Sequence, residues 1–335
     1  MKRWMMMALG LAFSAFFVWL GFRDLKINEL IDIIRTIDAG WLILAAVVYQ
    51  LAAYIITWRW YFLLHPVKDV HAHSLFPIVM IGYMGNNIYP ARIGEFIRAY
   101  LLKKDEQIPY APSLATIIVE RIFDGLVMLS FVFTALLFVE FDNEVIRNVI
   151  VGTAPLFFGA LLVFSFLAVR PLLARRIYTS VITALLPQGI QEKVLHLADH
   201  FMSGLETLRT PRLLLFTWVS SLASWIVEAS TYWIVLRAFD FEVSFFVLML
   251  VMGLANLTTI LPSTPGYFGT FHGVVVIILE AFGVNGELAG AYAIVMHLVL
   301  WLPVTLFGAF FLIQRGMGWR DLEKATQQVE REAVA

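Results

Sequence analysis

The chain has 335 residues, of which 60% are hydrophobic and only 15% are charged. This composition lies outside the range of soluble globular proteins and indicates a multi-pass membrane protein. The formal net charge of −1 does not indicate nucleic-acid binding, and the absence of cysteine excludes disulfide and thiolate chemistry.

Six apolar segments approach the ~20 residues that a helix needs to cross a bilayer. We predict full transmembrane helices at residues 4–22, 41–64, 113–139, 149–169, 213–238 and 288–313. The first segment follows Lys2 and Arg3 and is not followed by a small-residue cleavage site. We therefore interpret it as a retained helix and not as a signal peptide.

Two further apolar segments are interrupted in the middle by polar, Pro- and Gly-containing motifs. Residues 76–102 contain NNIYPARIGEFIR, and residues 245–282 contain LPSTPGYFGTFHG. A backbone break at membrane depth costs several kcal/mol unless protein or a wet cavity shelters it. We interpret both segments as re-entrant hairpins made of two half-helices, and we expect a substrate site at the breaks.

The Lys and Arg residues of the loops predict the orientation. Basic loops around Lys68, Lys103 and Arg315 are predicted to be cytoplasmic, which places both termini on the cytoplasmic side of the cytoplasmic (inner) membrane. Residues 41–139 and residues 213–313 then each consist of a span, a hairpin and a second span. The two units have opposite orientations in the membrane. The fold class is thus an all-α polytopic membrane protein with an inverted-topology repeat and a site near the midplane.

One transmembrane domain, residues 1–315, is predicted in this arrangement. It includes a cytoplasmic amphipathic linker at residues 171–210 and is followed by a short cytoplasmic tail at residues 316–335.

The first break carries three charged residues at helical spacing. Arg92, Glu95 and Arg98 are three residues apart and share one side of a helix that Pro90 is suited to begin. An Arg guanidinium matches the oxygens of a phosphate, and Gly94 keeps the helix thin where another group approaches. The alternative is a charged cytoplasmic face that only anchors the hairpin at the membrane surface.

The third predicted span contains ionisable residues at depth. Glu120 and Asp124 lie four residues apart on one face, next to Arg121. Ionisable groups at such depth usually pair with one another or line a polar cavity. We expect Arg92 or Arg98 to pair with Glu120 or Asp124, either as a structural ion cluster or as a network that substrate rearranges.

The second break offers hydroxyls, free amides and a helix N-terminus, which together favour an anion. Its candidate binding residues are Thr264, Pro265, Gly266, Gly269, Thr270 and His272. The histidine either titrates near neutral pH or is a hydrogen-bonded core residue. Glu228 and Glu280 are single acids in apolar runs, suited to proton coupling or charge pairing, although Glu280 fits the outer interface equally well.

The sequence contains no phosphate-binding Gly loop, zinc motif or nucleophile elbow. We therefore expect no cofactor and no ATP-driven pump. No pattern indicates an oligomeric state.

The motifs NNIYPARIGEFIR, ERIFDG and PGYFGTFHG, in this order, resemble the transmembrane region of lysylphosphatidylglycerol synthases, a family with many stand-alone flippase-like members. The resemblance covers residues 7–313, and many members carry Glu where this chain has His272. No counterpart of the aminoacyl-transferase domain is expected. The residues that match the first two motifs are Asn86, Pro90, Arg92, Gly94, Glu95, Arg98, Glu120, Arg121 and Asp124.

The resemblance implies transbilayer movement of a phospholipid or of a polyprenyl-phosphate-linked lipid. In this interpretation Arg92 and Arg98 engage the phosphate, and three acids position them or meet the headgroup: Glu95, Glu120 and Asp124. One alternative is a membrane-embedded transferase that uses one of these acids as a base. Another is a non-catalytic partner of a soluble or membrane transferase, docked on residues 171–210. A transporter is favoured over an enzyme.

Overall fold

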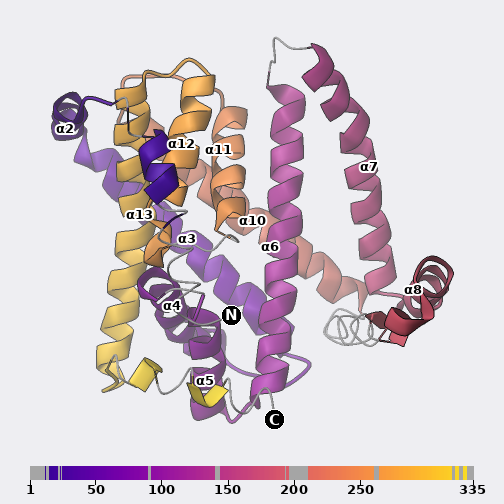
Figure 1. The fold of residues 1–335 in the computed structure, drawn as a ribbon. Coiled ribbons are helices and arrows are strands. Elements are labelled where there is room, and N and C mark those ends of the chain that lie inside the picture. Colours follow the sequence, from indigo (N-terminus) through magenta and orange to yellow (C-terminus); the bar gives the residue numbers. More distant parts are fainter. Residues whose placement is uncertain are drawn as a thin grey trace.

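The computed structural model describes residues 12, 15–21, 23, 25–89, 92–139, 144–192, 194–195, 210–259, 264–318, 321–323 and 327–329. Within these residues all regular secondary structure is helical (Figure 1). An all-α fold is therefore confirmed for the described part of the chain.

Four helices are long and apolar enough to cross a membrane: α3 (Ala39–Leu64), α6 (Tyr110–Phe138), α10 (Pro211–Leu236) and α13 (Gly286–Gln314). At 1.5 Å per residue, 26 residues extend about 39 Å, more than the ~30 Å of a hydrocarbon core. These helices agree with four of the six predicted spans. Their N-termini are held by side-chain caps from Asp38, Thr210 and Asn285 where the chain enters α3, α10 and α13.

The other two predicted spans are described less completely. α7 (Glu144–Ala168) is a helix of 25 residues, of which residues 152–166 form an apolar stretch shorter than a full span. The predicted span at residues 4–22 lies mostly outside the described residues, and only residues 15–21 are seen as a helical segment.

Both predicted interruptions are present. The first segment consists of α4 (Ala72–Ile88) and α5 (Gly94–Glu106), and the second of α11 (Phe245–Thr258) and α12 (Thr270–Ala281). The two helices of each pair pack against each other, and α13 packs against both α4 and α12. In Figure 1 the α4–α5 pair lies in the lower half of the bundle and the α11–α12 pair in the upper half.

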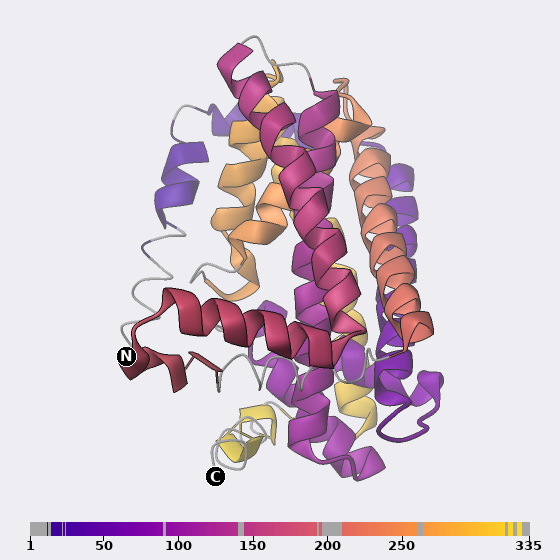
Figure 2. The same cartoon turned by 90° about the vertical axis from the view of Figure 1, so that its right-hand side faces the viewer.

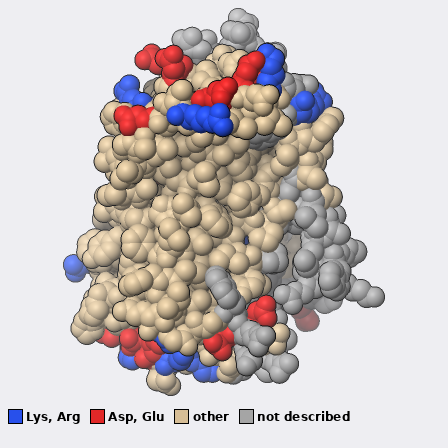
Figure 3. Space-filling model, turned by 90° about the vertical axis from the view of Figure 1, so that its left-hand side faces the viewer, with Lys and Arg blue, Asp and Glu red and all other residues tan. Residues whose placement is uncertain are grey.

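The remaining helices lie at the periphery. α2 (Ile27–Thr36) buries Leu30 and packs against α13. α8 (Pro171–Leu185) belongs to the predicted linker and runs across the axis of α7 (Figure 2). Charged side chains gather at the two ends of the molecule, with a broad, mostly uncharged band between them (Figure 3). Such a band is what a membrane-embedded surface requires.

Candidate functional site

A buried ion network joins the first broken segment to α6. The carboxylate of Glu120 is fully buried and accepts two hydrogen bonds from Arg98, at 2.8 and 3.1 Å. Arg121 donates a third, at 2.8 Å, and Arg59 lies 3.7 Å away. The expected pairing of Arg98 with Glu120 is therefore confirmed, and it fastens α5 to α6.

Arg59 of α3 is a partner that the sequence analysis did not single out. Its guanidinium is 1% exposed and donates to Asp124 and to Ser221, both at 2.7 Å. Trp225 of α10 also donates to Asp124, at 3.2 Å. The network thus connects α3, α6 and α10. The sequence did contain a signal for this partner, because Arg59 is a single arginine inside an otherwise apolar predicted span.

The helices of the first segment approach closely at glycines. A methyl group at Gly94 would overlap the carbonyl oxygen of Gly82 and lie 2.7 Å from Oδ1 of Asn86. That same Oδ1 accepts a hydrogen bond from the Gly94 amide, at 2.9 Å. The predicted need for a thin helix at Gly94 is confirmed, and the approaching element is α4. Pro90, predicted to begin this helix, lies outside the described residues.

Arg92 links the first break to the end of α11. Its guanidinium donates to the hydroxyl of Thr259 at 2.5 Å and lies 3.9 Å from Glu95. The same Glu95 carboxylate lies 3.5 Å from Arg121. Arg92 has a φ of 53°, in the left-handed region where a residue with a Cβ is strained.

Exposure divides the arginines of the network into two pairs. The side chains of Arg92 and Arg121 are 32% and 27% exposed, whereas those of Arg59 and Arg98 are 1% and 2% exposed. The guanidinium of Arg98 is enclosed by Glu120 and by the ring of Trp60 at 4.1 Å, so contact between Arg98 and a phosphate stays a prediction. Only the first pair is accessible to a ligand.

The second break is also strained. Pro265–Tyr267 forms one short 3-10 turn, in which Gly266 and Tyr267 have φ of 67° and 61°. A methyl group at Gly266 would lie 2.9 Å from Nε1 of Trp301 and 3.0 Å from the carbonyl oxygen of Asn87. The tips of the two broken segments therefore meet here. Each tip holds one non-glycine residue in the left-handed region, Arg92 or Tyr267.

The hydroxyls predicted to bind substrate at this break donate hydrogen bonds within the loop, and their role in binding stays a prediction. Thr264 donates to the carbonyl of Phe268 at 2.7 Å, and Thr270 donates to the carbonyl of Tyr267 at 3.2 Å. Pro265 is exposed at the start of the turn. Pro262 and Ser263 of the same motif lie outside the described residues.

His272 caps its own helix. Its Nδ1 accepts a hydrogen bond from the amide of Gly269 at 3.3 Å, so part of the N-terminus expected to hold an anion is occupied by the protein itself. The ring is 8% exposed and stacks on His297 of α13, with centroids 4.7 Å apart. Of the two alternatives for His272, this geometry agrees with the hydrogen-bonded core histidine.

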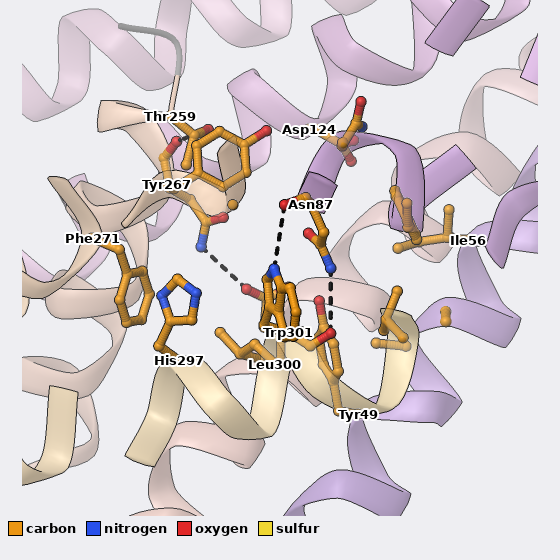
Figure 4. A pocket seen from close by; sticks show the side chains of 18 of the residues that line it. Tyr49, Ile56, Asn87, Asp124, Thr259, Tyr267, Phe271, His297, Leu300 and Trp301 are labelled. Carbon is orange, nitrogen blue, oxygen red and sulfur yellow. Dashed lines mark hydrogen bonds between the residues drawn. The ribbon is translucent and has the colours of Figure 1, made fainter. Parts of the chain in front are cut away.

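A cavity of about 170 Å³ lies between the two breaks. It has room for several water molecules. Figure 4 shows its side chains converging from both broken segments and from α3 and α13. Its polar lining residues include Tyr49, Tyr83, Asn86, Asn87, Arg92, Arg121, Asp124, Trp225, Glu228, Asn256, Tyr267, His297 and Trp301. Those from α3, α6, α10 and α13 sit near the middle of their helices, so the cavity lies about halfway along these helices.

Six predicted residues line this cavity: Asn86, Arg92, Arg121, Asp124, Glu228 and Gly266. Eight others are not among its lining residues: Glu95, Arg98, Glu120, Thr264, Pro265, Gly269, Thr270 and His272. Glu280 is exposed at the far end of α12. The polar lining residues that the sequence analysis missed are the tyrosines, the tryptophans, Thr259, His297 and the amides of Asn87 and Asn256.

Glu228 is a buried acid at the cavity wall. It is 7% exposed and accepts a hydrogen bond from Asn256 at 3.1 Å. Among the described residues, no Lys or Arg lies within ion-pair distance of it. It is therefore separate from the arginine network.

These features define a multi-pass membrane protein with a polar cavity about halfway along its long helices, where two interrupted segments meet. The family model of the lysylphosphatidylglycerol synthase TM region matches residues 7–308, and the chain belongs to this family. The resemblance predicted from the motifs is thereby confirmed.

Three relatives illustrate the range of the similarity. UPF0104 membrane protein MJ1595 of Methanocaldococcus jannaschii is 24% identical over 300 residues, covering 86% of this chain and 89% of that protein. A UPF0104 membrane protein of Methanothermobacter thermautotrophicus is 28% identical over 331 residues, 93% of each chain. Glycosyltransferase AglD of Haloferax volcanii is 24% identical over 321 residues, which is 84% of this chain and 50% of AglD.

Proposed function

We propose that this protein moves an amphiphile with a phosphate-bearing headgroup, a phospholipid or a polyprenyl-phosphate-linked lipid, across the cytoplasmic membrane. The observation that carries this proposal is the pair of accessible guanidinium groups, Arg92 and Arg121, at a cavity halfway along the membrane-crossing helices. An arginine fork binds phosphate oxygens with charge-assisted hydrogen bonds.

The charge count of the network supports an anionic ligand. Four arginines (Arg59, Arg92, Arg98 and Arg121) face three carboxylates (Glu95, Glu120 and Asp124), which leaves one positive charge in excess. An uncompensated charge inside a membrane protein is costly. A phosphate between the two accessible arginines compensates it.

Within this proposal the other charged residues position the binding pair. Glu95 lies within ion-pair distance of both Arg92 and Arg121 and orients them toward the cavity. Arg98 and Glu120 hold α5 against α6 beneath them. These residues therefore act on the headgroup through the two accessible arginines.

The proposed topology comprises six spans and two re-entrant hairpins as an inverted repeat, with both termini in the cytoplasm. The α4–α5 hairpin enters from the cytoplasmic side, where Lys68 and Lys103 lie, and the α11–α12 hairpin enters from the opposite side. The meeting of the hairpin tips at mid-depth supports this arrangement. Movement of one repeat against the other then opens the cavity to each side in turn.

Glu228 is the proposed coupling residue. A cavity-facing acid without a nearby cation is suited to exchange a proton as the headgroup enters and leaves. We expect Glu228→Gln to abolish the response of transport to an imposed proton gradient. Glu280→Gln, at the exposed end of α12, is the matched control and retains the response. Equal responses in both variants exclude this role for Glu228.

The proposal is tested in proteoliposomes by dithionite quenching of acyl-NBD phosphatidylglycerol. A hydrogen bond to a charged group contributes about 1.5–3 kcal/mol, so Arg92→Gln and Arg121→Gln should each slow flipping roughly 10- to 100-fold. Arg35→Gln changes an arginine that is 74% exposed on α2 and should leave the rate unchanged. Wild-type rates in both cavity variants contradict the proposal.

The similarity to glycosyltransferase AglD favours one second candidate, a role beside or within glycan transfer. In that case purified protein turns over a labelled polyprenyl-phosphate sugar, or co-purifies with a transferase that docks on residues 171–210. Mass spectrometry of the lipid products distinguishes the two functions. Lipids that change sides without chemical change support translocation.

A further inference from the structure

Three tyrosines from three different elements line the cavity. They are Tyr49 of α3, Tyr83 of α4 and Tyr267 of the short turn at the second break. Each is half-buried. Among the described residues, no hydrogen-bond partner is found for any of the three phenols, and none of their oxygens is enclosed.

The three phenols share one cavity with the arginines and with Glu228. Arg92, Arg121 and Glu228 line it together with Tyr49, Tyr83 and Tyr267. A headgroup whose phosphate rests on the arginines therefore lies in the same cavity as the three phenols.

Free amide groups add to this surface. Toward the described residues, the side chain of Asn86 uses only its Oδ1, and those of Asn87 and Asn256 use only their Nδ2 groups. One amide donor and two amide oxygens thus remain for a ligand. The rings of Trp225 and Trp301 provide flat apolar faces at the same wall.

The hydrogen-bonding groups of the cavity wall favour some headgroup chemistries over others. A phenol both donates and accepts hydrogen bonds, as does an alcohol, whereas an ammonium only donates and a phosphate only accepts. Two carboxyls line the cavity: Asp124 is paired with Arg59 and Arg121, and Glu228 accepts a hydrogen bond from Asn256. Three phenols and three amides match a ligand with several hydroxyls.

We propose that the cavity recognises a hydroxyl-rich headgroup, a sugar or cyclic polyol, attached to the phosphate. The phosphate is held by Arg92 and Arg121, and the hydroxyls are held by Tyr49, Tyr83 and Tyr267. This inference rests on the proposed function and specifies its substrate class.

The test compares three dihexanoyl lipids with identical tails, binding to the purified full chain in detergent by titration calorimetry. Phosphatidylinositol carries a polyol, phosphatidylethanolamine an amine, and phosphatidate only the phosphate. We expect phosphatidylinositol to bind at least tenfold more tightly than the other two.

Tyr-to-Phe variants identify the groups responsible, because they remove the hydroxyl and keep the ring. Tyr49→Phe, Tyr83→Phe and Tyr267→Phe should each weaken phosphatidylinositol roughly two- to tenfold and leave phosphatidate unchanged. Since no partner for these hydroxyls is found in the described part of the chain, the melting temperature should not change. Tyr54→Phe, on the same helix as Tyr49 but 54% exposed, is the matched control.

The outcomes distinguish a failure of the headgroup inference from a failure of the proposed function. Equal affinity for phosphatidylinositol and phosphatidate overturns the headgroup inference, and tightest binding of phosphatidylethanolamine overturns it in favour of an amine at Glu228. Phosphatidate binding that Arg92→Gln does not weaken contradicts the proposed function, as does failure of all three lipids to bind. If the headgroup inference is overturned but Arg92→Gln still weakens phosphatidate binding, the proposed function is retained.

Discussion

Glu120→Gln is the most direct perturbation of the ion network, because it removes one charge and keeps the shape of the side chain. The carboxylate accepts two hydrogen bonds from Arg98 and one from Arg121, and Arg59 lies 3.7 Å away. Glutamine leaves these three cations with one fewer anion. The excess positive charge of the network then rises from one to two.

The expected cost follows from the burial of this group. Removing one partner of a buried ion pair costs about 3–5 kcal/mol, since the remaining charge is left uncompensated. At about 2 °C per kcal/mol for a large domain, the melting temperature should fall by about 6–10 °C. Thermal unfolding of the purified protein in detergent, followed by intrinsic tryptophan fluorescence, measures this shift.

Glu106→Gln is the matched control. Its carboxylate pairs with Lys68 at 3.1 Å, but the two side chains are 22% and 48% exposed. A surface pair contributes at most about 1 kcal/mol, so the melting temperature should change by no more than about 2 °C. Equal shifts in Glu120→Gln and Glu106→Gln refute the view that the network holds α5 against α6.

Two glycine substitutions test how the breaks are packed. Gly94→Ala should destabilise the protein by about 1–3 kcal/mol and reduce flipping, because its methyl group overlaps the Gly82 carbonyl. Gly125→Ala, with no atom within 4 Å of the new methyl, should be neutral or stabilising in the same melting and flipping assays. Gly266→Ala combines a positive φ with crowding against Trp301, whereas Gly283→Ala has the positive φ alone. Both should lose about 1–3 kcal/mol, but only Gly266→Ala should slow flipping; equal transport in the two contradicts a role for the loop tip.

Much of the site could be predicted because charges are rare in apolar segments. Arg98, Glu120 and Asp124 stand out in the sequence for this reason, and the structure brings all three into one network. The breaks in the helices could be predicted from the Pro, Gly and polar residues that interrupt the hydropathy. Membership of the family followed from the motifs at the same positions.

The choice of partners could not be predicted, because it depends on how each helix is rotated. Arg98 faces α6 and is sealed, while Arg92, six residues earlier, reaches Thr259 across the cavity. Sequence spacing treats these two arginines alike. The roles of the two arginines differ because α4 packs closely on α5, an approach that Gly94 permits.

Aromatic residues were the larger omission. Tyr49, Tyr83 and Trp301 occur in apolar runs, where such rings usually pack or sit at the membrane interface. Their position at the cavity depends on contacts between segments more than 200 residues apart, such as the bond from Trp301 to the carbonyl of Asn87 at 3.4 Å. Local periodicity contains no information about such contacts.

The most direct test of the central claim is an experimental structure of the protein in lipid nanodiscs containing phosphatidylinositol. The account predicts density for a phosphate between the guanidinium groups of Arg92 and Arg121, with the headgroup directed toward Tyr49 and Tyr267. A cavity without lipid density, and lipid phosphates bound only at the surfaces of the bundle, would contradict it.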